Sequence, residues 1–119
     1  MSKAHSRLET ILKKINFIEE IIIEAGSITK ALEDEKSLRP AIMMHFTSIA
    51  EQFNKLAQDS EFEILQEFDK RDLKGTYDMR NYIVHDYEGI NLAIIEKVIR
   101  EKLPLIKKTT ILILKQLRS

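Results

Sequence analysis

Apolar residues recur at steps of three and four along almost the whole chain, the spacing that places them on one face of an α-helix. The sequence has no runs rich in valine and threonine that alternate with polar residues, as β-strands do. Three glycines and two prolines leave few points at which helices must end. The pattern predicts an all-α protein.

Capping and breaking residues divide the first part of the chain. A helix is predicted over residues 6–25, because Ser6 and Glu9 have the spacing of a capping box and Gly26 can end the helix. A short helix is expected over residues 28–34.

A second long helix is predicted to begin at Leu38, with Ser37 as its N-cap. Pro40 then falls in the first turn, where its missing amide costs no hydrogen bond. A short helix over residues 61–68, introduced by Ser60, should follow.

The last third of the chain predicts two more main helices. One covers about residues 73–86, and Gly89 marks the end of this segment. The other starts after the capping residue Asn91. Pro104 should kink or split this last helix. The sum is an up-and-down bundle of four main helices with one or two short extra helices.

Composition limits the class of protein further. The 119 residues are enough for one domain, 1–119, and 44% hydrophobic with 32% charged residues is typical of a soluble globular protein. The absence of cysteine excludes disulfides, zinc-thiolate sites and thiol nucleophiles. The first residues do not resemble a signal peptide, and the longest apolar runs are too short to span a membrane, so a cytoplasmic protein is expected.

Charge is balanced in total but uneven along the chain. Asp59 to Asp69 holds five acids and no base, whereas the segment from Lys97 onward holds seven bases against Glu101 alone. Such a basic segment can meet phosphates, or it can be the solvated face of an amphipathic helix.

Two of the three histidines offer little chemistry. His5 lies in an N-terminal stretch expected to be mobile, and His45 is expected on the flank of the core face of its helix. Neither has another histidine or a carboxylate at metal-ligand spacing, and no glycine-rich phosphate loop is present. We therefore expect no metal and no cofactor.

The third histidine stands in residues 80–87, Arg-Asn-Tyr-Ile-Val-His-Asp-Tyr. The inward face of this helix should be apolar, made by Met79, Tyr82 and Ile83. Since a helix turns about 100° per residue, Arg80 and His85 then point about 140° apart, with Asn81 on the His85 flank. Tyr87 shares the Arg80 flank if the helix reaches that far. Two chains around a two-fold axis can bring an Arg80 and a His85 together, so the spacing favours a dimer if the pair is functional.

Histidine can take or give a proton at neutral pH, and arginine offers a planar fork of donors to a phosphate. Those two groups are sufficient for metal-free RNA cleavage in which the 2′-hydroxyl attacks the adjacent phosphorus. In the structural interpretation, Arg80 pairs with Asp78 or Glu88, and His85 merely ends a helix. Spacing alone leaves both open.

The octet resembles the signature of the HepT-like ribonuclease toxins, a branch of the all-helical HEPN group. Met79-Arg80-Asn81 and Ile83-Val84-His85-Asp86-Tyr87 are similar to the family's Arg-x-x-x-x-His-x-Tyr core. Ser48-Ile49-Ala50-Glu51 resembles its Ile-Gly-Glu segment, and Leu103-Pro104-Leu105 its late Leu-Pro-x-Leu. Lys70-Arg71-Asp72-Leu73 stands where the family commonly has a tryptophan.

The resemblance, over roughly residues 6–117, implies a homodimeric RNA endonuclease that acts as the toxin of a toxin–antitoxin pair. It makes Arg80 and His85 the catalytic residues and Asn81 a supporting one. The expected antitoxin is an MntA-like nucleotidyltransferase that transfers AMP to Tyr87. A bulky anion two residues from His85 would repel an RNA phosphate.

Two alternatives stay open. The first is a HEPN domain that binds nucleotide, RNA or a nucleotidyltransferase partner without cleaving. The second is a helical-bundle interaction protein with a purely structural role. A neighbouring reading frame for a small nucleotidyltransferase would discriminate among them.

Overall fold

The computed structural model of the protein describes residues 2–118, and every regular element in that range is helical. The all-α fold predicted from the sequence is confirmed. No helix among the described residues is both long and apolar enough to cross a membrane. In chain order the elements are α1 (Lys3–Ala25), α2 (Ile28–Glu33), α3 (Leu38–Gln58), α4 (Phe62–Leu65), α5 (Lys70–His85), the 3₁₀ turn η1 (Tyr87–Gly89), α6 (Leu92–Glu101) and α7 (Leu103–Arg118).

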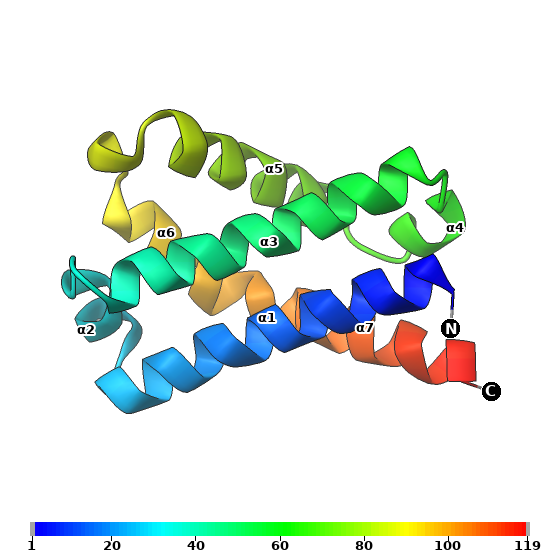
Figure 1. Cartoon of the computed structure of the whole chain (residues 1–119), viewed down its shortest axis with the longest axis horizontal. Helices are drawn as coiled ribbons and strands as arrows, with labels where there is room; N and C mark the ends of the chain where they lie inside the picture. Colours follow the sequence, from blue (N-terminus) through cyan, green and yellow to red (C-terminus); the bar gives the residue numbers. More distant parts are fainter. Residues whose placement is uncertain (1, 119) are drawn as a thin grey trace.

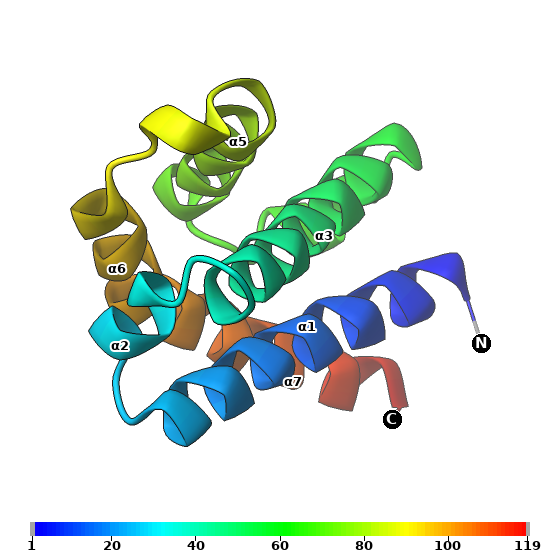
Figure 2. The same cartoon turned by 60° about the vertical axis from the view of Figure 1, so that its left-hand side comes forward.

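The main helices run up and down along the long axis of the molecule (Figure 1). α1 packs on both α3 and α7, and α6 packs on α2 and α7. α5 packs on α3, on the side away from α1, as both views show (Figures 1 and 2). The helix that carries the octet therefore lies at the outside of the bundle.

The core explains that placement. Its fully buried members come mainly from α1 and α3, and include Leu8, Ile11, Ile15, Ile18, Ile42, Phe46, Ile49 and Phe53. α5 adds only Met79 and Ile83 to the buried apolar set. Because burial of apolar surface is the main force that holds a helix in place, α5 is held along one narrow stripe and exposes the rest.

Several predicted boundaries are confirmed. Gly26 ends α1 with φ 99°, a left-handed conformation that glycine adopts without strain. The Oδ1 of Asn91 accepts a hydrogen bond from Ala93 N at 2.9 Å and so caps α6. The last helix is split as expected, into α6 and α7 at Lys102, two residues before Pro104.

Other boundaries differ from the prediction. α4 is one turn only, because Ser60 has φ 59° and does not cap it. α5 starts at Lys70 rather than Leu73, since Oδ1 of Asp69 accepts a hydrogen bond from Arg71 N at 2.7 Å and forms an earlier N-cap.

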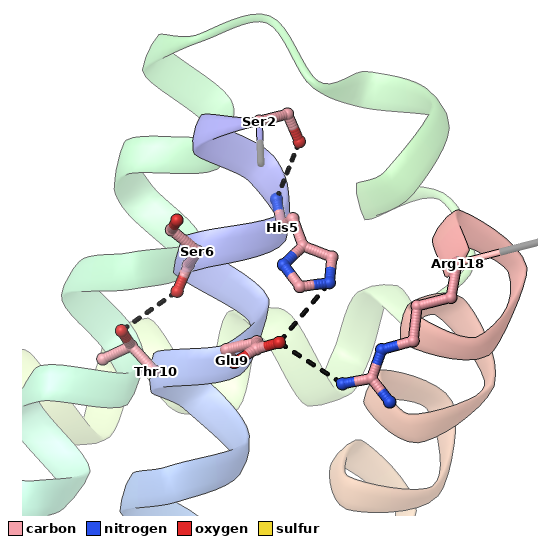
Figure 3. A network of polar contacts seen from close by, with 6 residues as sticks. All are labelled: Ser2, His5, Ser6, Glu9, Thr10 and Arg118. Atoms are coloured by element: carbon pink, nitrogen blue, oxygen red, sulfur yellow. Dashed lines mark hydrogen bonds and ion pairs between the residues drawn. The ribbon is translucent and has the colours of Figure 1, made fainter.

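The N-terminal prediction was wrong as well. Ser2, not Ser6, caps α1 by accepting a hydrogen bond from His5 N at 3.1 Å (Figure 3). His5 is buried within α1, with its Nε2 3.4 Å from Oε1 of Glu9. The same Oε1 lies 3.3 Å from Nη2 of Arg118 in α7 (Figure 3). This network joins the first helix to the last one, so His5 is not part of a mobile tail.

Candidate functional site

α5 stays a regular helix through His85 and then stops. Asp86 is its C-cap, with φ −151° and ψ 56°, and its amide donates to the carbonyl of Tyr82. A Cβ on Gly89 would lie 2.5 Å from Oδ2 of Asp86, so glycine leaves room for that carboxylate in the turn. Because the helix does not unwind before His85, the side chains of Arg80 and His85 leave it about 140° apart, as predicted.

Arg80 is half-buried, and its Nη1 donates a hydrogen bond to Oδ1 of Asn81 at 3.2 Å. The predicted structural pairing of Arg80 with an acid is wrong within residues 2–118. Asp78 instead accepts from Lys74 Nζ at 2.8 Å, and Glu88 forms no ion pair with Arg80. The guanidinium therefore has donors available for a phosphate.

His85 is exposed and is the last residue of α5. No hydrogen bond or ion pair joins its ring to another residue among 2–118. The side chain is therefore open to solvent and to a substrate, which a general acid or base requires.

Tyr87 does not lie where a continued helix would place it. It belongs to η1, and its hydroxyl is buried without a hydrogen-bond partner among the described residues. Burial raises the pKa of Tyr87; the cation of Arg39 opposes this rise, while Glu88 and Glu35 add to it. The expected position beside Arg80 on one helical flank is wrong, because the helix ends two residues earlier.

The position of Tyr82 also differs from the prediction. It was predicted to point inward with Met79 and Ile83, yet it is 52% exposed while those two are buried. Its ring stands at the mouth of a groove between α5 and α6. A further groove, between α3 and α5, is lined by Ile83 and Tyr87 together with Met43 and Met44 of α3.

In a comparison with protein-family models, residues 11–113 match the model of the ribonuclease HepT-like family. The match includes the whole octet and most of the bundle. The chain belongs to the ribonuclease HepT-like family. None of the curated proteins and none of the solved structures compared with the chain matches it.

Membership of a ribonuclease family makes RNA the substrate class. Within the described part of the chain, no group of three or more histidine, aspartate and glutamate side chains has the geometry to hold a metal ion. His45 remains on the flank of the core, where its ring lies 5.2 Å from that of Phe17. Burial lowers the pKa of His45, and Lys14 adds to that effect.

The stretch that replaces the expected tryptophan of the HepT-like pattern has its own anchor. Asp72 is buried, and its Oδ1 lies 3.1 Å from Nζ of Lys102 at the junction of α6 and α7. This ion pair fastens the start of α5 to the last two helices. No local sequence pattern indicates this pair, because the partners are thirty residues apart.

The basic C-terminal segment is largely engaged in ion pairs. Besides Lys102, the bases with acidic partners are Arg100 with Glu96 and Glu101, Lys107 with Glu19, and Arg118 with Glu9. This pattern favours the interpretation of a solvated helix face over a phosphate-binding surface.

Proposed function

We propose that the protein is a metal-independent RNA endonuclease and the toxin component of a toxin–antitoxin pair. The observation that carries this proposal is the pair of exposed or half-buried groups on α5, Arg80 and His85, neither of which is held by an acidic partner within residues 2–118. Family membership supports the ribonuclease part.

The chemistry follows from these two side chains. His85 takes the proton of a ribose 2′-hydroxyl, and O2′ attacks the neighbouring phosphorus. The P–O5′ bond breaks, the leaving oxygen takes a proton, and a 2′,3′-cyclic phosphate remains. Arg80 donates hydrogen bonds to the phosphate oxygens, whose charge is redistributed in the transition state. Asn81 supports the site by holding the guanidinium at 3.2 Å.

A homodimer is part of the proposal. On one regular helix Arg80 and His85 point about 140° apart, so a single α5 presents them poorly to one phosphate. α5 lies at the outside of the bundle (Figure 2), where a two-fold axis can place two copies of it side by side. Each site then combines Arg80 of one chain with His85 of the other.

The proposal also includes control by an MntA-like nucleotidyltransferase antitoxin, which transfers AMP to Tyr87. In that reaction the oxygen of Tyr87 bonds to the α-phosphorus of ATP, the bond to pyrophosphate breaks, and the phenolic proton is lost. The buried hydroxyl must first reach solvent, which requires η1 to open. A hydroxyl without a partner regains hydrogen bonds with water when it is exposed, which offsets part of the cost of opening.

A non-catalytic HEPN domain that binds nucleotide, RNA or a nucleotidyltransferase is the second candidate. It is favoured by the zero net charge and by the absence of the tryptophan that the family commonly has before the octet. Such a protein would bind its ligand and leave RNA intact.

The deciding experiment incubates the purified chain with a mixture of RNA oligonucleotides and follows cleavage. Wild type should cut, while Arg80→Ala and His85→Ala should lose about 10²–10⁴-fold in rate. Arg71→Ala is the matched control, because it removes an exposed arginine from the first turn of the same helix. Binding without cleavage by the wild type would support the second candidate instead.

A further inference from the structure

The groove between α5 and α6 has the dimensions and chemistry of a small ligand site. Its volume is about 260 Å³, just below the roughly 300–1,000 Å³ of pockets for drug-sized ligands. Apolar walls come from Met79 and Tyr82 on α5 and from Ile94 and Val98 on α6. Such a space suits one flat ring system better than a large molecule.

Two apolar side chains at this groove are open to solvent. Tyr82 is 52% exposed and Ile94 is 54% exposed. Gly75 lines the same groove, and a Cβ added there would meet no atom within 4 Å. The ring of Tyr82 is therefore accessible, and the space beside it is not filled by the protein.

The candidate catalytic histidine does not line the groove, but it follows Tyr82 by three residues on α5. Asp78, Tyr82 and His85 point within about 60° of one another on a helix of 3.6 residues per turn. His85 lies about 4.5 Å beyond Tyr82 along the helix axis, at a rise of roughly 1.5 Å per residue. A ligand held against Tyr82 therefore lies next to His85.

The surface of the groove is almost wholly apolar, and the polar groups of Asp78 and Asn91 lie beside it rather than in it. Asn91 uses Oδ1 to cap α6, at 2.9 Å from Ala93 N, so its amide hydrogens remain to donate. Asp78 holds Lys74 at 2.8 Å through Oδ2 and has its other oxygen left to accept. Exposed lysines follow on both helices, Lys74 on α5 and Lys97 one turn after Ile94 on α6.

We propose that the α5–α6 groove is a nucleobase-binding slot for the RNA nucleotide beside the bond that is cut, with Tyr82 as its stacking platform. Single-stranded RNA is commonly recognised by bases that stack on aromatic side chains and pair their edges with polar groups. The slot holds the base, and the adjoining ribose comes to His85. This inference rests on the proposed ribonuclease function.

The test uses the full-length protein and RNA oligonucleotides in which one base near the cut is removed while the ribose and its 2′-hydroxyl are kept. For wild type, kcat/KM should fall roughly 5- to 140-fold when the base beside the cut is absent, the range expected for one stacked base. Tyr82→Ala should show the same fall on intact RNA and no further fall on the abasic RNA. Tyr82→Phe should retain the wild-type response, since it keeps the ring.

Two more variants serve this test, one that blocks the slot and one that is a control. Gly75→Leu should block the slot without removing any group, because the position is helical and open. Phe62→Ala should behave as wild type, because Phe62 is 61% exposed on α4, at the opposite end of the molecule from α6 (Figure 1). Circular dichroism and light scattering of each variant show whether fold and assembly are kept.

The proposal is overturned if Tyr82→Ala still responds to the missing base as wild type does. It is also overturned if the variant loses activity by losing its dimer, since a second copy would then cover the groove. Binding of RNA with a 2′-deoxynucleotide at the cut, measured by fluorescence anisotropy, separates the hypothesis of the nucleobase slot from that of the ribonuclease function. Base- and Tyr82-dependent binding by a protein that cuts no RNA would refute the ribonuclease function alone, whereas cleavage independent of Tyr82 would refute the slot alone.

Discussion

Arg80 donates a hydrogen bond from Nη1 to Oδ1 of the next residue, Asn81, at 3.2 Å. Asn81 lies about 100° further around α5, on the flank that His85 occupies. The hydrogen bond restrains the guanidinium and gives Asn81 a physical role, that of orienting the arginine.

Loss of this orientation should be measurable. Asn81→Ala removes one solvent-exposed hydrogen bond, whose net value of about 0.5–1.5 kcal/mol corresponds to a roughly 2- to 12-fold lower kcat/KM. Steady-state cleavage of one RNA oligonucleotide checks it, with Arg71→Ala as control. A loss as large as that of Arg80→Ala would mean that Asn81 contacts the substrate itself.

The divergence of Arg80 and His85 predicts sites shared between chains. Arg80→Ala and His85→Ala proteins, each inactive alone, should regain activity when mixed under conditions that allow chains to exchange. Random pairing makes half of the dimers mixed, and each mixed dimer has one intact site, so about a quarter of wild-type activity is expected. If exchange is verified by mass and no activity returns, each site is built within one chain.

The buried hydroxyl of Tyr87 predicts an effect on stability. Tyr87→Phe removes an oxygen that has no partner within residues 2–118, so the free energy of unfolding should stay equal or rise by about 1 kcal/mol. Burial raises the pKa of Tyr87 above 10.0, so wild type loses stability as pH rises through that raised value. The Tyr87→Phe variant should lose less stability over the same rise in pH. Thermal melts at neutral pH and above pH 10 test this, and a clear loss of stability at neutral pH would reveal a partner for the hydroxyl.

The same variant tests modification. With ATP and the cognate nucleotidyltransferase, wild type should gain the mass of AMP and stop cutting, whereas Tyr87→Phe should remain unmodified and active. AMP found on the Phe variant would remove Tyr87 from the regulatory account.

The ion pair between Asp72 and Lys102 predicts an asymmetric loss of stability. Lys102→Ala leaves a buried carboxylate without its cation and should cost about 2–4 kcal/mol. Asp72→Ala frees a lysine that can turn to solvent and should cost only about 1–2 kcal/mol. Urea denaturation of both variants and of the double variant measures the two losses. Equal and small losses would mean that the pair does not anchor α5.

Local patterns predicted the bundle well because the apolar face of each main helix packs directly against neighbouring helices. Leu8, Ile15, Ile42 and Phe46, which stand at helical spacing in the sequence, all fall in the core. Gly26 and the Asn91 cap act within their own few residues, which is why the sequence located them.

The site was harder, because it depends on long-range contacts. Tyr82 has the apolar register of an inward residue, but the open space between α5 and α6 leaves it exposed. Tyr87 would share the flank of Arg80 only on a longer helix, but α5 ends at His85 and the hydroxyl of Tyr87 turns inward. His5 pairs with Glu9 one turn along α1, and Glu9 also pairs with Arg118 of the last helix, a contact that no local pattern contains.

The central claim, that Arg80 and His85 cut RNA without a metal ion, is tested most directly by the end groups of the product in excess EDTA. Wild type should leave 2′,3′-cyclic phosphate ends, detected by mass spectrometry, and an RNA with a 2′-deoxynucleotide at the cut should stay intact. His85→Ala should leave no product above background. Cleavage that stops on chelation and returns with a divalent ion, or that proceeds equally well in His85→Ala, would contradict the account.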